Sequence, residues 1–153
     1  MNASIFKRNL KARLIALVVC VAAYVVMWSL SANALNDIYV FKWMARNRSF
    51  FFGAVIAIIP LLFSKPLIAC FATLGTFFGG VSGQLIGDYI YDKNVAMITP
   101  DMTVEQQAHL SYHRGFAILG CVWFGFLALG VILSVIIGLG KKREAKIAVT
   151  REH

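Results

Sequence analysis

The chain has 153 residues, of which 59% are hydrophobic and only 14% are charged, and its mean hydropathy is +0.74. Soluble domains are about 45–50% apolar and about 25% charged, so the composition excludes an ordinary water-soluble protein. The formal net charge of +8 comes from basic residues at the ends of apolar runs, without a basic module interleaved with aromatics. We therefore expect an integral membrane protein that binds membrane lipid and no nucleic acid.

The first predicted span covers residues 14–30, an uncharged apolar run that follows the basic segment 1–13. Its length is close to that needed to cross hydrocarbon at about 1.5 Å per residue, and its basic flank predicts a cytoplasmic amino terminus. An alternative is a secretory signal cleaved after Ala34, because Ala32, Asn33 and Ala34 form an A-x-A site. The later helices have the same orientation in both interpretations.

Residues 35–49 predict an amphipathic helix that lies at the lipid headgroups and leads into the next span. Ile38, Phe41 and Ala45 are expected to share its apolar face. Its cations fall on the predicted outer side, contrary to the positive-inside rule. These cations are Lys42, Arg46 and Arg48.

The next two apolar runs, 50–63 and 67–87, predict a tight hairpin. Pro60 is expected to kink or end the first arm, and the turn falls before Pro66 because a residue before proline leaves the helical region. Lys65 is then at the cytoplasmic interface, whereas at membrane depth a lysine costs about 2.5–3.5 kcal/mol. A re-entrant hairpin that does not cross fully is the alternative.

Glycines recur at four-residue intervals in the second arm of this hairpin, which places them on one face of a helix. They are Gly75, Gly79, Gly83 and Gly87. In lipid, helices associate by close backbone approach at small residues, so we expect a glycine-zipper helix whose packing interface also includes Gln84. Two interpretations remain open: the groove holds the first or last helix of this chain, or it joins a second copy or another membrane protein.

After Gly87 the chain is polar as far as residue 115, and we expect this loop on the outer side. Thr103 and Gln106 form a capping-box pattern, which predicts a short helix from about residue 103 that continues into the last span, 116–140. The basic tail 141–153 is expected in the cytoplasm. The predicted fold is therefore a single all-α membrane domain, a small bundle of about four transmembrane helices.

Glu105, His109 and His113 are candidate metal ligands, because a continuous helix places residues four apart on one stripe. Successive turns are about 6 Å apart, so a usable site needs a further ligand. The candidates for it are Asp88, Asp92 and Asp101. The same histidines also fit an exposed polar face, or a contact that switches as the histidines gain and lose protons.

Gln84 and Asp88 are one helical turn apart at the end of the glycine helix. Polar residues in lipid face the bundle interior or mark a pathway, so a hydrogen bond between helices is the simpler role. An ion or pore contact is the alternative, with Asp92 near the outer mouth.

No catalytic signature or cofactor site is recognisable, and Cys20, Cys70 and Cys121 lie inside apolar runs without disulfide or metal spacing. The leading hypothesis is a non-enzymatic, multi-pass protein of the bacterial inner membrane with both termini cytoplasmic. It would act through helix–helix contacts as an accessory, regulatory or immunity-type partner of another membrane component, with the glycine groove of residues 73–87 as its contact surface. The alternatives are a small oligomeric pore or transporter, holin-like or ion-conducting, and a metal-dependent membrane enzyme.

Overall fold

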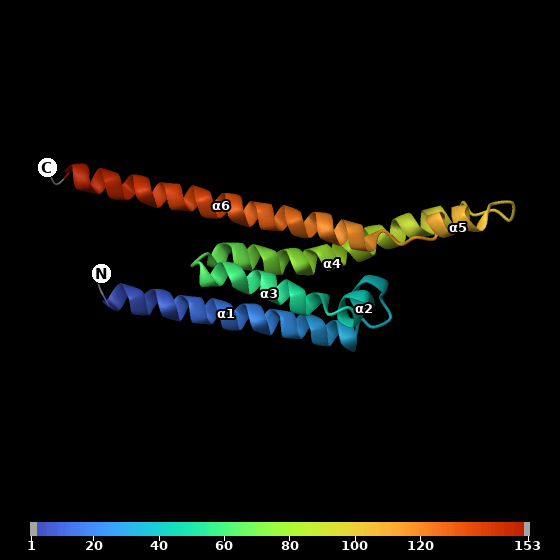
Figure 1. Ribbon diagram of the computed structural model, residues 1–153, viewed down its shortest axis with the longest axis horizontal. Coiled ribbons are helices and arrows are strands. Elements are labelled where there is room, and N and C mark those ends of the chain that lie inside the picture. The colour runs from blue at the N-terminus through green and yellow to red at the C-terminus, as the bar shows by residue number, and fades with distance from the viewer. Residues whose placement is uncertain (1–2, 152–153) are drawn as a thin grey trace.

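The computed structural model describes the backbone of residues 3–151, and the side chains of residues 10–140 except Ala12. Every regular element in the described range is an α-helix, which confirms the all-α prediction. Four long helices run side by side (Figure 1). They are α1 (Ala3–Ala32), α3 (Ser49–Leu62), α4 (Pro66–Val95) and α6 (Gly115–Arg151). Two short helices, α2 (Tyr39–Arg46) and α5 (Val104–Leu110), lie at the end opposite the chain termini (Figure 1).

Three of the described segments are helical, long and apolar enough to cross a membrane, which agrees with a multi-pass membrane protein. They are Arg13–Ala32, Pro66–Val95 and Val104–Gly140, and the last of these includes the break between α5 and α6. Helices α2 and α3 pass the same test only as a pair, and they meet at a bend of 73°. The number of spans is therefore three, or four if this bent pair counts as one. With 14 residues, α3 by itself is about 21 Å long, less than the hydrocarbon thickness of about 30 Å.

The bend between α2 and α3 is made at Arg48, whose φ of 57° lies in the left-handed region. Helix α2 before the bend is amphipathic, with Val40 and Met44 buried and Lys42 exposed. Its buried face is thus centred on Val40 and Met44, whereas the residues expected to share the apolar face, Ile38, Phe41 and Ala45, are only half-buried. The bend of 73° at Arg48 thus sets α2, the predicted interfacial helix, at a steep angle to α3.

The turn between α3 and α4 falls where the sequence predicts it. Pro60 lies inside α3, which continues to Leu62 before the chain turns. The turn is closed by the Lys65 amide, which donates to the Pro60 carbonyl at 2.8 Å, and Ser64 adopts a φ of 60°. The turn between α3 and α4 lies at the same end of the molecule as the termini (Figure 1), and Lys65 in this turn is exposed.

The core lies among α1, α2, α3 and α4, and small residues of α3 and α4 allow close approach. Ala57 of α3 and Ala72 of α4 are fully buried beside Tyr24 of α1. The Tyr24 hydroxyl forms a hydrogen bond with the Thr76 hydroxyl at 2.9 Å. A Cβ on Gly53 would lie 2.9 Å from the Tyr24 ring, so a glycine is needed under this ring.

Candidate functional site

The glycine face of α4 lies against α6 of the same chain. A Cβ on Gly79 would be 3.0 Å from the Leu119 carbonyl oxygen, and one on Gly83 would be 2.5 Å from the Gly115 carbonyl oxygen. Because these neighbours are backbone atoms, a side chain could fit only if the two helices moved apart. In the structure, α6 therefore occupies the groove that the sequence left open to an internal or an external partner.

The close approach of α4 and α6 extends along most of their shared length. A Cβ on Gly75 would lie 2.9 Å from Phe126 Cβ, and one on Gly130 of α6 would lie 2.8 Å from Phe71 Cβ. Gly87 is buried beneath His113 at the other end of the contact. Gly115 and Gly130 thus contribute to the interface from α6.

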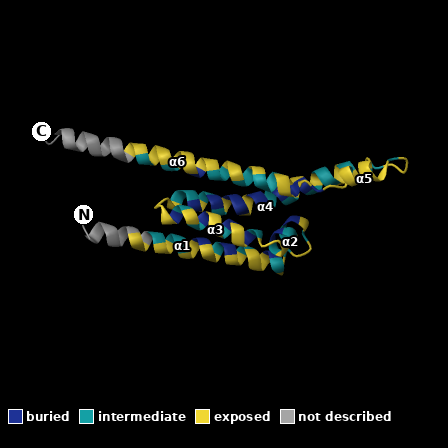
Figure 2. Ribbon diagram, viewed as in Figure 1, coloured by how far each residue is buried: buried dark blue, intermediate teal, exposed yellow. Residues whose placement is uncertain are grey.

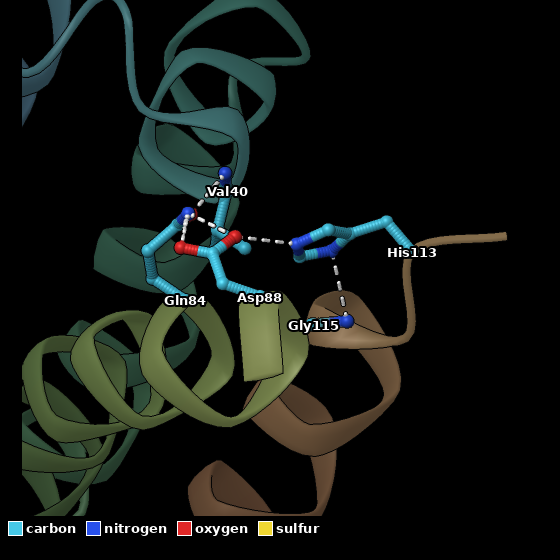
Figure 3. A network of polar contacts seen from close by, with 5 residues as sticks. All are labelled: Val40, Gln84, Asp88, His113 and Gly115. Atoms are coloured by element: carbon cyan, nitrogen blue, oxygen red, sulfur yellow. Dashed lines mark hydrogen bonds and ion pairs between the residues drawn. The ribbon is translucent and has the colours of Figure 1, made fainter. Parts of the chain in front are cut away.

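A network of polar contacts closes this interface at the end that holds α2 and α5 (Figure 3). Gln84 is its first member: its Oε1 accepts from the Val40 amide at 2.8 Å, and its Nε2 donates to the Asp88 oxygens at 2.7 and 2.6 Å. Gln84 and Asp88 are one turn apart on α4, as predicted, and both are directed toward the start of α2. The two side chains therefore connect α2 with α4.

His113 extends the network to α6. Its Nε2 lies 3.0 Å from Asp88 Oδ1, and its Nδ1 accepts from the Gly115 amide at 3.1 Å (Figure 3). Because Nδ1 accepts a hydrogen bond, the neutral tautomer with the proton on Nε2 satisfies both contacts. In that tautomer His113 donates to the Asp88 carboxylate, so every member of the network has a matched donor and acceptor.

The network replaces helix caps that the local sequence does not supply. The first amides of a helix have no partner within that helix. Ile38 at the N-cap of α2 offers no side-chain hydrogen bond, and Gln84 accepts from the second residue of α2 instead. His113 plays the same part at the start of α6. The Asp88 carboxylate thus lies near two helix N-termini, where negative charge is favourable.

The surroundings of this network are aromatic on one side and open on the other. The ring of Tyr39 is centred 4.3 Å from that of His113, and the ring of Tyr91 is 5.9 Å away. The His113 side chain is only 8% exposed, whereas that of Asp88 is 49% exposed. Asp88 faces an open cleft of about 480 Å³, which Asp92 also lines. His113 is therefore buried within the network, whereas the Asp88 carboxylate is accessible to solvent.

The prediction that one helix continues from about residue 103 into the last span is wrong. The capping box at Thr103 and Gln106 is present, but α5 ends at Leu110 and α6 begins at Gly115. The Ser111 hydroxyl donates to the Gln107 carbonyl at 2.6 Å at this end of α5. The segment predicted as an outer loop is also more helical than expected, because α4 continues past Gly87 to Val95.

This break separates the predicted metal ligands. Glu105 and His109 are exposed on α5, whereas His113 is buried against Asp88 beyond the break. Asp101 is exposed, and a hydrogen bond from the Thr99 hydroxyl lowers the pKa of its carboxyl group. Within the described part of the chain, no group of three or more histidine, cysteine or acidic side chains is close enough to hold a metal ion.

The outward face of α6 is a feature that the sequence analysis missed. Its small residues Ala117, Cys121 and Gly125 recur at four-residue intervals, and all three are exposed. Nothing lies within 4 Å of the position that a Cβ on Gly125 would take. Only 6% of the most apolar stretch of this span is buried, against 39% for α4 (Figure 2). In the sequence, the only sign of this face is the four-residue spacing of its small residues. That spacing is less conspicuous than the glycine repeat of α4.

Comparisons of the chain with protein-family models, with curated proteins and with solved structures gave no match. No relative therefore supplies an activity or a residue role for this protein. The features that bear on its function are its own: the polar network at one end of the α4–α6 pair and the open face of α6.

Proposed function

We propose that this protein is a non-enzymatic, multi-pass membrane protein that acts through helix–helix contacts of α6. The observation that carries this proposal is the exposed stripe of Ala117, Cys121 and Gly125. In lipid, such small-xxx-small stripes let a second helix approach closely, and a helix pair gains its stability from that packing. The stripe on α4 already holds α6, whereas the stripe on α6 is open to a partner among the described residues.

The position of α6 in the fold suits this role. Its described contacts are made chiefly with α4, and it lies at the edge of the helix layer (Figure 1). The glycine contacts and the His113 network hold it against α4 along one side. Because α6 is already held on one side, binding a partner on its other side requires little further loss of conformational entropy. The partner is a second copy of this chain or the helix of another membrane component that it assists or regulates.

Cys121 provides a direct test, because it lies in the stripe and is exposed. In a Cys70→Ser variant it is the one exposed cysteine, since Cys20 is buried. We expect oxidation in native membranes to link Cys121 to the partner, giving a homodimer or a larger adduct. The adduct should be lost in Cys121→Ser and reduced at least severalfold in Gly125→Leu.

Gly138→Leu is the matched control for the crosslinking test. Gly138 lies on the same helix but outside the stripe, and nothing lies within 4 Å of the position that its Cβ would take. The same substitution should therefore leave crosslinking at the wild-type level. Equal crosslinking in Gly125→Leu and Gly138→Leu would contradict an interaction through this stripe, as would the absence of any Cys121 adduct.

Charge supports a bacterial inner-membrane orientation with both termini in the cytoplasm. At the end that holds α2 and α5, basic and acidic residues are equal in number. The basic ones are Lys42, Arg46, Arg48, Lys93 and Arg114, and the acidic ones are Asp37, Asp88, Asp92, Asp101 and Glu105. The whole formal net charge of +8 thus belongs to the other end. The positive-inside rule therefore favours that end as cytoplasmic, despite the cations near α2.

Labelling of intact cells with an impermeant maleimide tests this orientation. In a background that carries Cys70→Ser and Cys121→Ser, we expect Ser111→Cys to be labelled from outside. Lys65→Cys should be labelled only after the membrane is opened. The reverse pattern would mean that the termini are outside.

The other hypotheses have less support among the described residues. A pore needs polar side chains free to line a path, but Gln84 and Thr76 are engaged in hydrogen bonds between helices. The metal-dependent enzyme depended on Glu105, His109 and His113 lying together, and the break after Leu110 separates them. Neither alternative is favoured by a specific contact.

A further inference from the structure

An apolar groove lies between residues of α1 and α3, two helices that are neighbours in the fold (Figure 1). Its volume is about 420 Å³, and Val25 and Trp28 of α1 face Phe51, Val55 and Ile58 of α3 across it. One charged residue, Arg48, lines the groove at one end. The groove is thus strongly apolar along its length and cationic at its mouth.

Arg48 lies at the depth where lipid headgroups are expected. It follows the amphipathic helix α2 directly, and Trp28 near the end of α1 also lines the groove. Tryptophan and amphipathic helices both favour the interface between lipid and water. The cationic mouth of the groove is therefore at the membrane surface, and its apolar part extends into the hydrocarbon.

The charge of Arg48 is available to an external anion. Its side chain is exposed, and the one ion pair among the described residues joins His113 and Asp88. Arg48 is also the N-cap of α3, and no hydrogen-bond acceptor is present for the amides of Ser49 and Phe50 in the described part of the chain. A helix N-terminus carries partial positive charge, which adds to that of the guanidinium group.

The length of the groove matches one leaflet of a membrane. From Arg48 to Ile58, α3 rises about 15 Å at about 1.5 Å per residue. Half of a hydrocarbon core of about 30 Å is the same distance. An amphiphile with its anionic group at Arg48 would therefore place one acyl chain along the whole groove.

We propose that this groove is a binding site for an anionic phospholipid, with one acyl chain between α1 and α3 and the phosphate on Arg48. Arginine suits this contact because its planar guanidinium group can donate two parallel hydrogen bonds to a phosphate. The site belongs to α1 and α3 and includes no residue of α6. The proposal is therefore independent of the partner surface described above, and each can fail without the other.

Trp28 provides the reporter for the test. In a full-length chain with Trp43→Phe and Trp123→Phe, Trp28 is the single tryptophan. This protein is placed in two series of phosphatidylcholine vesicles. One series contains phosphatidylglycerol with brominated acyl chains, and the other contains phosphatidylcholine with brominated acyl chains. Bromine quenches tryptophan fluorescence on contact. Comparing the quenching of Trp28 by the two brominated lipids therefore gives the preference of the groove for the anionic lipid. We expect a preference of about fivefold, equivalent to about 1 kcal/mol for one arginine at the surface.

Arg48→Asn and Arg46→Asn form a matched pair of charge variants. Asparagine tolerates the left-handed conformation at position 48, so the bend between α2 and α3 is retained. Arg46 is exposed on α2 and does not line the groove. The preference should fall to about one in Arg48→Asn and stay above threefold in Arg46→Asn. Equal quenching by both lipids in the parent protein, or an equal loss in the two variants, would overturn the proposal.

Val55→Phe and Val135→Phe test the apolar part of the site. Val55 lines the groove and is 42% exposed, whereas Val135 is 53% exposed on α6. The larger side chain should obstruct the groove at position 55, lowering both the quenching of Trp28 and the lipid preference, and have no effect at position 135. An unchanged preference in Val55→Phe would show that surface charge acts without the groove, and would refute an acyl-chain site.

Discussion

His113 Nε2 lies 3.0 Å from Asp88 Oδ1, and this contact fastens the start of α6 to α4. On its other side the same imidazole accepts from the Gly115 amide, so one ring serves both as a helix cap and as a link between helices. The contact lies directly above Gly87, the last glycine of the α4 face. The polar network and the glycine packing therefore stabilise the same pair of helices.

Replacing His113 with alanine should destabilise this pair. The substitution leaves the Gly115 amide without its acceptor and removes one donor to Asp88, and an unsatisfied buried polar group costs roughly 1–3 kcal/mol. The free energy of unfolding in mild detergent should fall by about this amount. His109→Ala is the matched control, because His109 is exposed on α5 and its loss should change stability by no more than about 0.5 kcal/mol. Equal losses in the two variants would argue against the capping role.

Gly83→Ala should force α4 and α6 apart, because the new Cβ would lie 2.5 Å from the Gly115 carbonyl oxygen. Overpacking of this kind costs about 1–3 kcal/mol. Gly125→Ala makes the same change where the structure has open space, and it should be neutral or stabilising by up to about 1 kcal/mol. Thermal unfolding of the two variants checks this difference. A Gly83→Ala protein as stable as Gly125→Ala would mean that the helices are not in backbone contact.

Gln84→Met should release the start of α2 while keeping a side chain of similar length. The Val40 amide loses its acceptor, so its hydrogen exchange should become faster by tenfold or more, since about 1.4 kcal/mol corresponds to tenfold. The Lys42 amide donates to the Ile38 carbonyl at 2.9 Å and serves as the internal control. If amide exchange measured by NMR accelerates equally at both positions, the whole helix has loosened and the specific capping role is wrong.

The hydrogen bond between Tyr24 and Thr76 should be worth only a little. Within a membrane protein such bonds average about 0.6 kcal/mol, because polar groups find other partners in the reference state. Thr76 has such a partner, since its hydroxyl also donates to the Ala72 carbonyl at 3.1 Å. A double-mutant cycle with Tyr24→Phe and Thr76→Val should give a coupling of about 0.6 kcal/mol. A coupling above about 2 kcal/mol would show that this bond is a principal restraint between α1 and α4.

The sequence was most informative where structure depends on neighbours along the chain. Long apolar runs place the helices, Ser64 and Lys65 precede a proline that begins α4, and Thr103 with Gln106 starts α5. Each of these signals acts within a few residues, through hydrophobic length, a backbone clash or a side-chain cap. The end of α5 was missed because the apolar character resumes only a few residues later, which favoured one continuous helix.

The sequence by itself thus determined that the chain is a helical membrane protein and that α4 has a smooth face. Only the tertiary structure decided that α6 fills this face, that His113 joins Asp88 and not His109, and that Ala117, Cys121 and Gly125 remain open. The physical reason is that helical periodicity specifies which residues share a face, whereas the helix opposite that face is chosen by the packing of segments far apart in the chain.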